Sequence, residues 1–258
     1  MQPLILLRSA LYVATMFAAV VPWSFVILGA AVVAKPTTRY KLCQMWTGLA
    51  MKLGRSLCGM DWRVEGWDKL PAGHAIVMSK HQSAWETFWL ATFMPHRLSF
   101  TYKRELAYLP FFGWALGSLG MISIDRSRGK DAFTQLLEKA PAHLADGWWI
   151  MMFPEGTRTL PGVTRRYKTG GARLAVATGT PIVPIALNSG ELWPRRSLTM
   201  KPGTITVVIG DPIDPAGKTA DQVAAEVETW IEGQMRRIAP HRYPDTRVPA
   251  ARAEAVRP

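Results

Sequence analysis

The stretch HAIVMSKHQSAWET at residues 74–87 predicts how this chain folds. The run at 74–80 is short and apolar, as expected of a buried strand, and a helical pattern begins at Ser83. Similar apolar runs recur along the chain, and helical segments separate them. Because strands that are apolar throughout need cover on both faces, the sequence predicts an α/β fold with a mostly parallel central sheet covered by helices.

The other predicted elements continue this alternation. Further strands are expected at 98–103, 121–126, 148–153, 181–188 and 204–210, and helices at 105–117, 130–145, 170–178 and 219–238. The last helix is amphipathic, with Val223, Val227 and Ile231 on the same face as Trp230. Thr219 and Gln222 have the spacing of a capping box at its start.

The N-terminal region is apolar enough to enter a membrane. No charged residue occurs from Ser9 to Ala34, and a helix of that length crosses a hydrocarbon core of about 30 Å. A cleaved signal peptide is the alternative, although this run is longer than a typical signal core. Pro22 divides the run, so a helix that bends or re-enters one leaflet competes with a straight span. The sequence therefore predicts a membrane-embedded helical segment ahead of the sheet.

Basic residues follow this apolar run, at Lys35, Arg39, Lys41, Lys52 and Arg55. The positive-inside rule then places the rest of the chain in the cytoplasm, at the inner membrane. Residues 38–57 have the pattern of an amphipathic helix, which either lies on the membrane or packs on the main domain. We accordingly divide the chain into membrane-anchoring helices at 1–58, a main domain at 59–239 and a tail at 240–258.

The chain is strongly basic, with a formal net charge of +12. Anionic membranes, phosphorylated small molecules and nucleic acid all attract such a charge. The basic residues are scattered and accompanied by 11 Trp and 12 Met, which favours a lipid surface over a nucleic-acid groove. Cys43 and Cys58 lack metal-ligand spacing and form no disulfide framework, so a reducing compartment is expected.

His81 and Glu86 allow two interpretations. His81 follows the strand at 74–80 directly, where sheet proteins place functional loops. If Ser83 caps the next helix, Glu86 lies in its first turn and can hold one ring nitrogen of His81, leaving the other to take a proton from a hydroxyl. Ser83 and Glu86 also fit a capping box that has no catalytic role. From these residues alone, both interpretations remain open.

The motif FPEGTR at 153–158 follows the strand at 148–153 and has the features of an anion site. A turn at Gly156 exposes backbone N–H groups, Thr157 adds a hydroxyl, and Arg158 adds a planar fork suited to phosphate. The alternative is a polar turn in which Glu155 and Arg158 pair with each other. Further basic residues follow at Arg165, Arg166 and Lys168.

Three more strand ends carry candidate residues. The motif YKREL at 102–106 supplies Lys103 and Arg104, and the apolar stretch at 106–117 follows it. Core packing is the default for such a stretch, although an acyl chain or a membrane face would use the same residues. A further Arg lies in Ile124-Asp125-Arg126, and VPIA at 183–186 is a strand interrupted by proline that could line a pocket.

In this order, KHQSAWE, KREL, FPEGTR and VPIA resemble the motifs of the glycerolipid acyltransferases, specifically the 1-acyl-glycerol-3-phosphate acyltransferases. The resemblance covers about residues 60–210. It implies an enzyme that moves a fatty acyl group from acyl-CoA or acyl carrier protein to the free hydroxyl of lysophosphatidic acid, giving phosphatidic acid in phospholipid biosynthesis. It implies an anionic membrane as a partner, no nucleic acid, no metal and no cofactor beyond the thioester co-substrate.

The resemblance also implies a role for each motif residue. His81 is the general base, and Glu86 orients it. The residues implied in substrate binding are Lys103, Arg104, Glu155, Gly156, Thr157 and Arg158 near the phosphate, and Val183, Pro184 and Ile185 beside the acyl chain. Two positions depart from the family pattern: Glu86 stands where Asp is usual, and Lys80 where Asn is commoner.

Other functions would use the same residues. A related acyltransferase could act on another lyso-lipid, such as a lyso amino-acid lipid, and only a panel of acceptors separates the two. A thioesterase would use His81 with water, although Ser83 does not lie in a Gly-x-Ser-x-Gly elbow. A non-catalytic protein that binds anionic lipid or nucleic acid would explain the charge but not four motifs in order.

Overall fold

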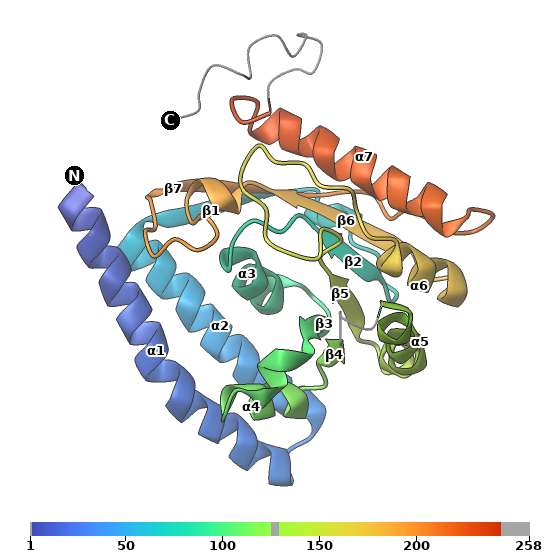
Figure 1. Ribbon diagram of the computed structural model, residues 1–258. Helices are drawn as coiled ribbons and strands as arrows, with labels where there is room; N and C mark the ends of the chain where they lie inside the picture. The colour runs from blue at the N-terminus through green and yellow to red at the C-terminus, as the bar shows by residue number, and fades with distance from the viewer. Residues whose placement is uncertain (1, 125–128, 244–258) are drawn as a thin grey trace.

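The computed structural model describes residues 2–124 and 129–243. It has one seven-stranded sheet with helices on both faces (Figure 1), so the predicted α/β class is confirmed. The strand end that was expected to carry Asp125 and Arg126 lies outside the described residues.

The sheet is mostly parallel, as predicted. Its strands are β1 (Met60–Glu65), β2 (Ile76–Ser79), β3 (Leu98–Lys103), β4 (Ile122–Ile124), β5 (Trp149–Met152), β6 (Ile182–Leu187) and β7 (Gly203–Ile209). They lie in the order β1-β7-β6-β2-β5-β3-β4, and every neighbouring pair is parallel except β6 and β7. The sequence does not predict β1, because its residues MDWRVE alternate in polarity and lie at the edge of the sheet.

The long helices are α1 (Gln2–Val33), α2 (Pro36–Cys58), α3 (Trp85–Phe93), α4 (Phe112–Ser118), α5 (Gly129–Ala145), α6 (Gly170–Thr178) and α7 (Ala220–Ile238). Short 3₁₀ helices are η1 (Trp67–Lys69), η2 (Arg104–Tyr108) and η4 (Ser189–Glu191). The expected helix at 105–117 is wrong in one respect, because it divides into η2 and α4. Pro110 has no N–H to continue a helix, and Phe111 has a φ of 62°.

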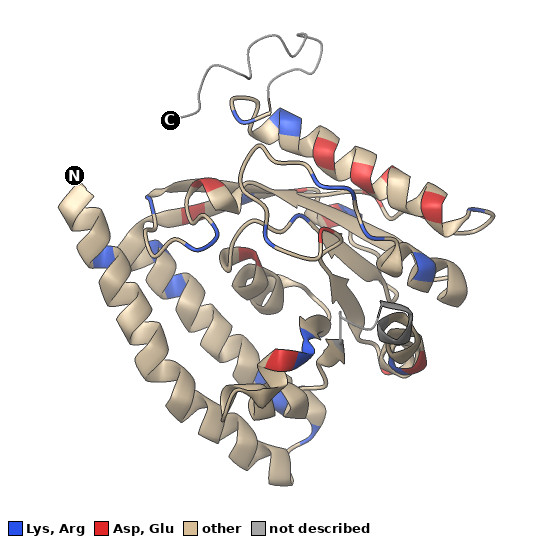
Figure 2. Ribbon diagram, viewed as in Figure 1, with Lys and Arg blue, Asp and Glu red and all other residues tan. Residues whose placement is uncertain are grey.

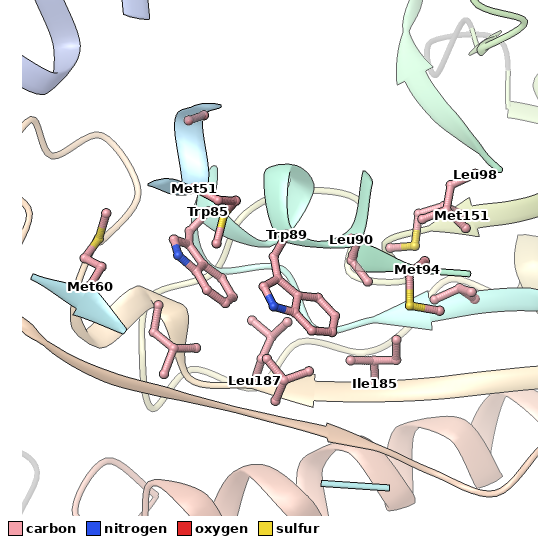
Figure 3. Close-up of a cluster of buried hydrophobic side chains, with 14 of the residues drawn as sticks. Met51, Met60, Trp85, Trp89, Leu90, Met94, Leu98, Met151, Ile185 and Leu187 are labelled. Carbon is pink, nitrogen blue, oxygen red and sulfur yellow. The ribbon is translucent and has the colours of Figure 1, made fainter. Parts of the chain in front are cut away.

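Two apolar clusters, one on each face, explain why the strands are apolar throughout. Ile76 and Met78 of β2 pack into a cluster with α5, α6 and α7, whereas Val77 packs into a cluster with α1, α2 and α3. Figure 3 shows the second cluster, in which Trp85 and Trp89 of α3 lie over strand residues of β6. This packing fixes α3, and with it the loop between β2 and α3.

In the described part of the chain, α1 is the helix that is long and apolar enough to cross a membrane. Its 32 residues extend about 48 Å at 1.5 Å per residue. Only 17% of its most apolar 18-residue stretch is buried, and Arg8 is its one charged residue (Figure 2). The helix continues through Pro22 without a break. The length and exposure of α1 indicate that the protein associates with a membrane.

One face of α2 packs on the main fold. Thr47, Ala50, Met51 and Gly54 are buried along this face, and Thr47 contacts Thr92 of α3 through a 2.8 Å hydroxyl–hydroxyl hydrogen bond. Of the two possibilities predicted for residues 38–57, the structure therefore shows packing against the main fold. A hydrogen bond of 2.9 Å from Trp23 Nε1 to the carbonyl of Leu42 ties α2 to α1.

Candidate active site

The side chains of His81 and Glu86 are in direct contact. His81 lies in the loop after β2, and its Nδ1 is 2.9 Å from Glu86 Oε1. The His81 side chain is 14% exposed, whereas that of Glu86 is fully buried. The structure gives His81 Nε2 no hydrogen-bond partner among the described residues. If Nδ1 carries the proton that binds Glu86, Nε2 is free to accept another.

Glu86 also accepts hydrogen bonds from the start of α3. The same Oε1 accepts from the backbone N–H groups of Gln82 and Ser83, each at 2.7 Å. Its other oxygen, Oε2, accepts from the hydroxyl of Ser189 at 2.6 Å. The two interpretations of this carboxylate therefore coexist, because one oxygen binds both the imidazole and the backbone of the helix start. The helix begins at Trp85, two residues later than predicted.

The FPEGTR motif holds His81 from the opposite side. The ring of Phe153 stacks on the imidazole, with 3.7 Å between ring centroids and 12° between planes. The backbone N–H of His81 donates to Glu155 Oε1 at 2.8 Å, and its carbonyl accepts from the N–H of Thr159 at 2.8 Å. Both motif loops thus form one unit around His81, as expected of loops at the ends of neighbouring parallel strands.

Glu155 points into the protein interior and does not line the cavity beside His81. Its side chain is fully buried, and its Oε2 lies 3.2 Å from Lys80 Nζ. Lys80 is also fully buried and pairs with Glu232 of α7 at 2.7 Å. Glu232 accepts a further hydrogen bond from the Tyr167 hydroxyl at 2.9 Å. The structure therefore separates the Glu155 side chain from Gly156, Thr157 and Arg158, the other predicted residues of this loop, which line a cavity beside His81.

The ionisation of this buried group depends on Lys80. Burial lowers the pKa of the Lys80 ammonium, but Glu155 and Glu232 outweigh burial and hold that pKa above its usual value. Burial raises the pKa of the Glu155 carboxyl, and Lys80 lowers it only in part. The Lys80 ammonium thus forms ion pairs with two carboxylates, those of Glu155 and Glu232. Lys80, which departs from the family pattern, has become the centre of an ion-pair network that joins β2, the FPEGTR loop and α7.

A cavity of about 650 Å³ opens beside His81. Its lining includes a set of basic and polar residues: Lys103, Gly156, Thr157, Arg158, Arg195 and Arg196. Most of the remaining lining is apolar and comes from α1, α2, α3 and α4 and the residue after α4, with Ile27, Trp46, Phe88, Phe112, Leu116 and Leu119 among its members. The cavity can therefore hold a molecule with an anionic head and a long apolar chain beside the imidazole.

Comparisons with known proteins agree with this arrangement. A family model described as Acyltransferase matches residues 61–188. Over 238 residues the chain is 38% identical to a 1-acyl-sn-glycerol-3-phosphate acyltransferase of Pseudomonas aeruginosa, which covers 91% of this chain and 92% of that protein. The chain belongs to this acyltransferase family.

Two further relatives support the assignment. The human 1-acyl-sn-glycerol-3-phosphate acyltransferase alpha is 32% identical over 171 residues, which cover 66% of this chain and 60% of that protein. The crystal structure of the 1-acyl-sn-glycerophosphate (LPA) acyltransferase PlsC from Thermotoga maritima matches with a TM-score of 0.75 and 24% identity. It covers 90% of this chain and 95% of that chain, and it shows the same fold.

The remaining predicted residues of the acyltransferase lie in two places. Lys103 lines the cavity and pairs with Glu105 at 2.8 Å, whereas Arg104 begins η2 and is not part of the cavity lining. Val183, Pro184 and Ile185 are buried in β6, and the structure does not bring them to the cavity. A central strand packs its side chains into the clusters on both faces of the sheet, which leaves none of these three for an acyl chain.

The sequence analysis does not name three residues of the candidate site. Ser189, which donates to Glu86, follows β6, and its place after a predicted strand is a signal that could have found it. Arg195 and Arg196 lie in the loop after η4, where no motif marks them. In the described residues, no three His, Cys, Asp or Glu side chains come close enough to hold a metal ion.

Proposed function

We propose that this acyltransferase moves a fatty acyl group from acyl-CoA or acyl carrier protein to the free hydroxyl of 1-acyl-glycerol-3-phosphate. The product would be phosphatidic acid, for phospholipid biosynthesis. The observation that carries the proposal is one cavity whose lining combines His81 with several basic residues and many apolar ones. The relatives are named for the same acceptor, which supports this choice.

In the proposed mechanism His81 is the general base. Its Nδ1–H stays bonded to Glu86, and its Nε2 removes the proton from the acceptor's hydroxyl as the oxygen attacks the thioester carbonyl. The tetrahedral intermediate collapses and expels the thiolate, which takes the proton back from the imidazolium. Glu86 stabilises that imidazolium. No covalent acyl-enzyme forms, and the donor thioester is the only co-substrate that the mechanism requires.

The FPEGTR loop would hold the acceptor's phosphate in the cavity. Gly156, Thr157 and Arg158 line the cavity, as does Lys103, and Arg104 follows Lys103 in the sequence. Glu155, whose carboxylate holds the backbone of His81, would position the base rather than bind the substrate. Gly156 has a φ of 70°, and the Lys168 side chain lies so close that a Cβ at this position would meet its Nζ at 2.9 Å. A second cation therefore lies directly over this turn.

We further propose that α1 and α2, residues 1–58, anchor the enzyme at the inner membrane. The catalytic domain at 59–239 would then face the cytoplasm, where the soluble acyl donor is found, and 240–258 would form a tail. The basic residues that follow α1 support this orientation. A net charge of +12 would also raise the local concentration of anionic lipid and acyl donor around the enzyme.

An acceptor panel tests this function. Purified protein in phospholipid vesicles should transfer acyl groups to lysophosphatidic acid with a higher kcat/KM than to 1-acylglycerol, lysophosphatidylcholine or a lyso amino-acid lipid. Each acceptor is assayed with acyl-CoA and with acyl carrier protein, by separating the radiolabelled lipid products. A preference for the lyso amino-acid lipid would overturn the proposed acceptor. Release of free fatty acid without transfer would indicate a thioesterase.

Glu86→Gln tests whether this carboxylate serves catalysis as well as the helix start. Glutamine keeps an oxygen for the N–H groups of Gln82 and Ser83, and the Ser189 hydroxyl can turn to accept from the new amide. We therefore expect an unchanged melting temperature within a few degrees, but a kcat lower by roughly 10²-fold, because the imidazolium loses its negative partner. Near-normal turnover would assign Glu86 to the helix start alone.

A further inference from the structure

We propose that Arg195 and Arg196, in the loop at 192–199, bind the phosphate of the lyso-lipid acceptor together with Arg158. This inference rests on the proposed function and adds residues that none of the four motifs contains. It makes the acceptor's phosphate site two-sided: the FPEGTR loop forms one side, and the loop after η4 forms the other. Four observations support it.

The first observation is position. Arg195 and Arg196 line the same cavity as His81, Thr157 and Arg158. Nη1 of Arg195 donates a hydrogen bond of 2.6 Å to the backbone carbonyl of Arg158. The two loops are therefore joined directly at residues that line the cavity, although 37 positions separate these residues in the chain.

The second observation is charge. No carboxylate among the described residues pairs with Arg158, Arg195 or Arg196, whereas Lys103, which also lines the cavity, has Glu105 as a partner. Three guanidinium groups without a negative partner repel one another, and a dianionic phosphate is the ligand that would neutralise them. The planar fork of a guanidinium also matches two phosphate oxygens at once.

The third observation is backbone conformation. Phe111 and Arg196 are the two non-glycine residues of the described chain that have a positive φ, and the value at Arg196 is 60°. This left-handed conformation costs a residue with a Cβ some free energy, and such strain concentrates at functional sites. Arg196 is exposed, and it has this backbone conformation at a position that lines the cavity.

The fourth observation favours the acceptor over the donor. The loop at 192–199 packs on α1, because the rings of Trp193 and Tyr12 lie edge to face at 5.8 Å and the N–H of Met200 donates to Ser9 Oγ at 2.9 Å. α1 is the helix whose apolar face is exposed. The arginines thus lie in a loop that contacts the helix proposed to enter the membrane, which favours the lipid acceptor over the water-soluble acyl donor as their ligand.

Arg196→Gln is the sharpest test, since glutamine keeps the Cβ and leaves the strained backbone as it is. At saturating acyl-CoA we expect the KM for lysophosphatidic acid to rise about 10- to 100-fold, because one charge-assisted interaction is lost. The kcat should stay within about threefold of the wild-type value. The KM for acyl-CoA at saturating acceptor should not change. Arg158→Ala should raise the same KM, and the slow acylation of 1-acylglycerol, which has no phosphate, should be insensitive to Arg196→Gln.

Arg236→Gln is the matched control. Arg236 is exposed on α7, outside the cavity lining, so this variant removes the same charge without touching the site. It should behave as the wild type in every assay. If the KM for lysophosphatidic acid rose equally in Arg196→Gln and Arg236→Gln, the effect would come from the change in net charge, and the inference would be overturned. A selective rise in the KM for acyl-CoA in Arg196→Gln would overturn it as well, by making this loop a donor site.

An equilibrium measurement separates this inference from the proposed function. In the His81→Ala background, lysophosphatidic acid in detergent micelles is titrated by calorimetry with and without Arg196→Gln. The affinity should fall by the same factor as the KM rises, and the affinity for 1-acylglycerol should not change. If the wild type acylates lysophosphatidic acid and this affinity is unaffected, only the phosphate site is wrong. If the wild type acylates a different acceptor, the proposed function is wrong, and the titration still decides whether these arginines bind a phosphate.

Discussion

His81→Ala should lower kcat by roughly 10²–10⁴-fold, the usual contribution of a general base, and should leave the protein folded. The ring makes few structural contacts: it stacks on Phe153 and bonds to Glu86. After its removal Glu86 would still accept from Gln82, Ser83 and Ser189. No buried carboxylate is left without a partner, so the free energy of unfolding should change by about 1 kcal/mol or less.

His96→Ala is the control for this variant. His96 stacks on Trp149 with 4.6 Å between centroids and 13° between planes, which resembles the stacking of His81, but it lies outside the cavity lining. Removing the His96 ring should lower the free energy of unfolding by about as much as His81→Ala does, and it should leave kcat unchanged. Single-turnover rates at saturating substrates and urea unfolding curves measure the two effects. If His81→Ala kept full activity, the base would have to be sought elsewhere in the cavity.

Lys80→Met should destabilise the fold by roughly 3–5 kcal/mol, the range for breaking a buried ion pair. Methionine fills a similar volume, but it leaves the Glu155 and Glu232 carboxylates buried together without a cation. One of them must take up a proton or move. Because Glu155 holds the backbone N–H of His81, any shift of Glu155 should also displace the base and lower kcat.

Lys218→Met gives the matched comparison for this loss. Lys218 pairs with Glu226 at 2.6 Å, about the distance between Lys80 and Glu232, but its side chain is 34% exposed. Water screens that pair, so its removal should cost no more than about 1 kcal/mol. Adding Glu232→Gln to Lys80→Met should restore part of the stability, since one fewer charge is buried alone. Equal losses in Lys80→Met and Lys218→Met, measured by urea unfolding, would show that the buried network contributes little.

Apolar patterning predicted most of the fold. Strands that are apolar on both faces stand out in a sequence, and six of the seven in the sheet were predicted within two residues. β1 has no such pattern because it is an edge strand, half exposed. The antiparallel pairing of β6 with β7 was beyond prediction as well, since apolar residues alone do not give the direction of a strand.

In the candidate site, only contacts between residues close together in the sequence could be predicted. The helix start fixes the geometry of His81 and Glu86, so their spacing was enough to predict their contact. The buried position of the Glu155 carboxylate was not predictable, because Glu155 pairs with Lys80, in the loop after β2, and Lys80 also pairs with Glu232 of α7. Arg195 and Arg196 enter the cavity from a loop that has neither motif nor periodicity, and only the three-dimensional fold brings them beside Arg158.

α1 has two different surroundings on its two sides. Trp23 and Ile27 line the apolar part of the cavity, while Phe17, Val21 and Phe25 are exposed on the outside. The helix that we propose to embed in the membrane therefore also lines the cavity that would hold the acyl chain. A chain shortened to begin at Pro36, made to dissolve in water without detergent, would open this cavity to solvent. Removing α1 to make the enzyme soluble in water would therefore also remove part of the lining of the proposed substrate cavity.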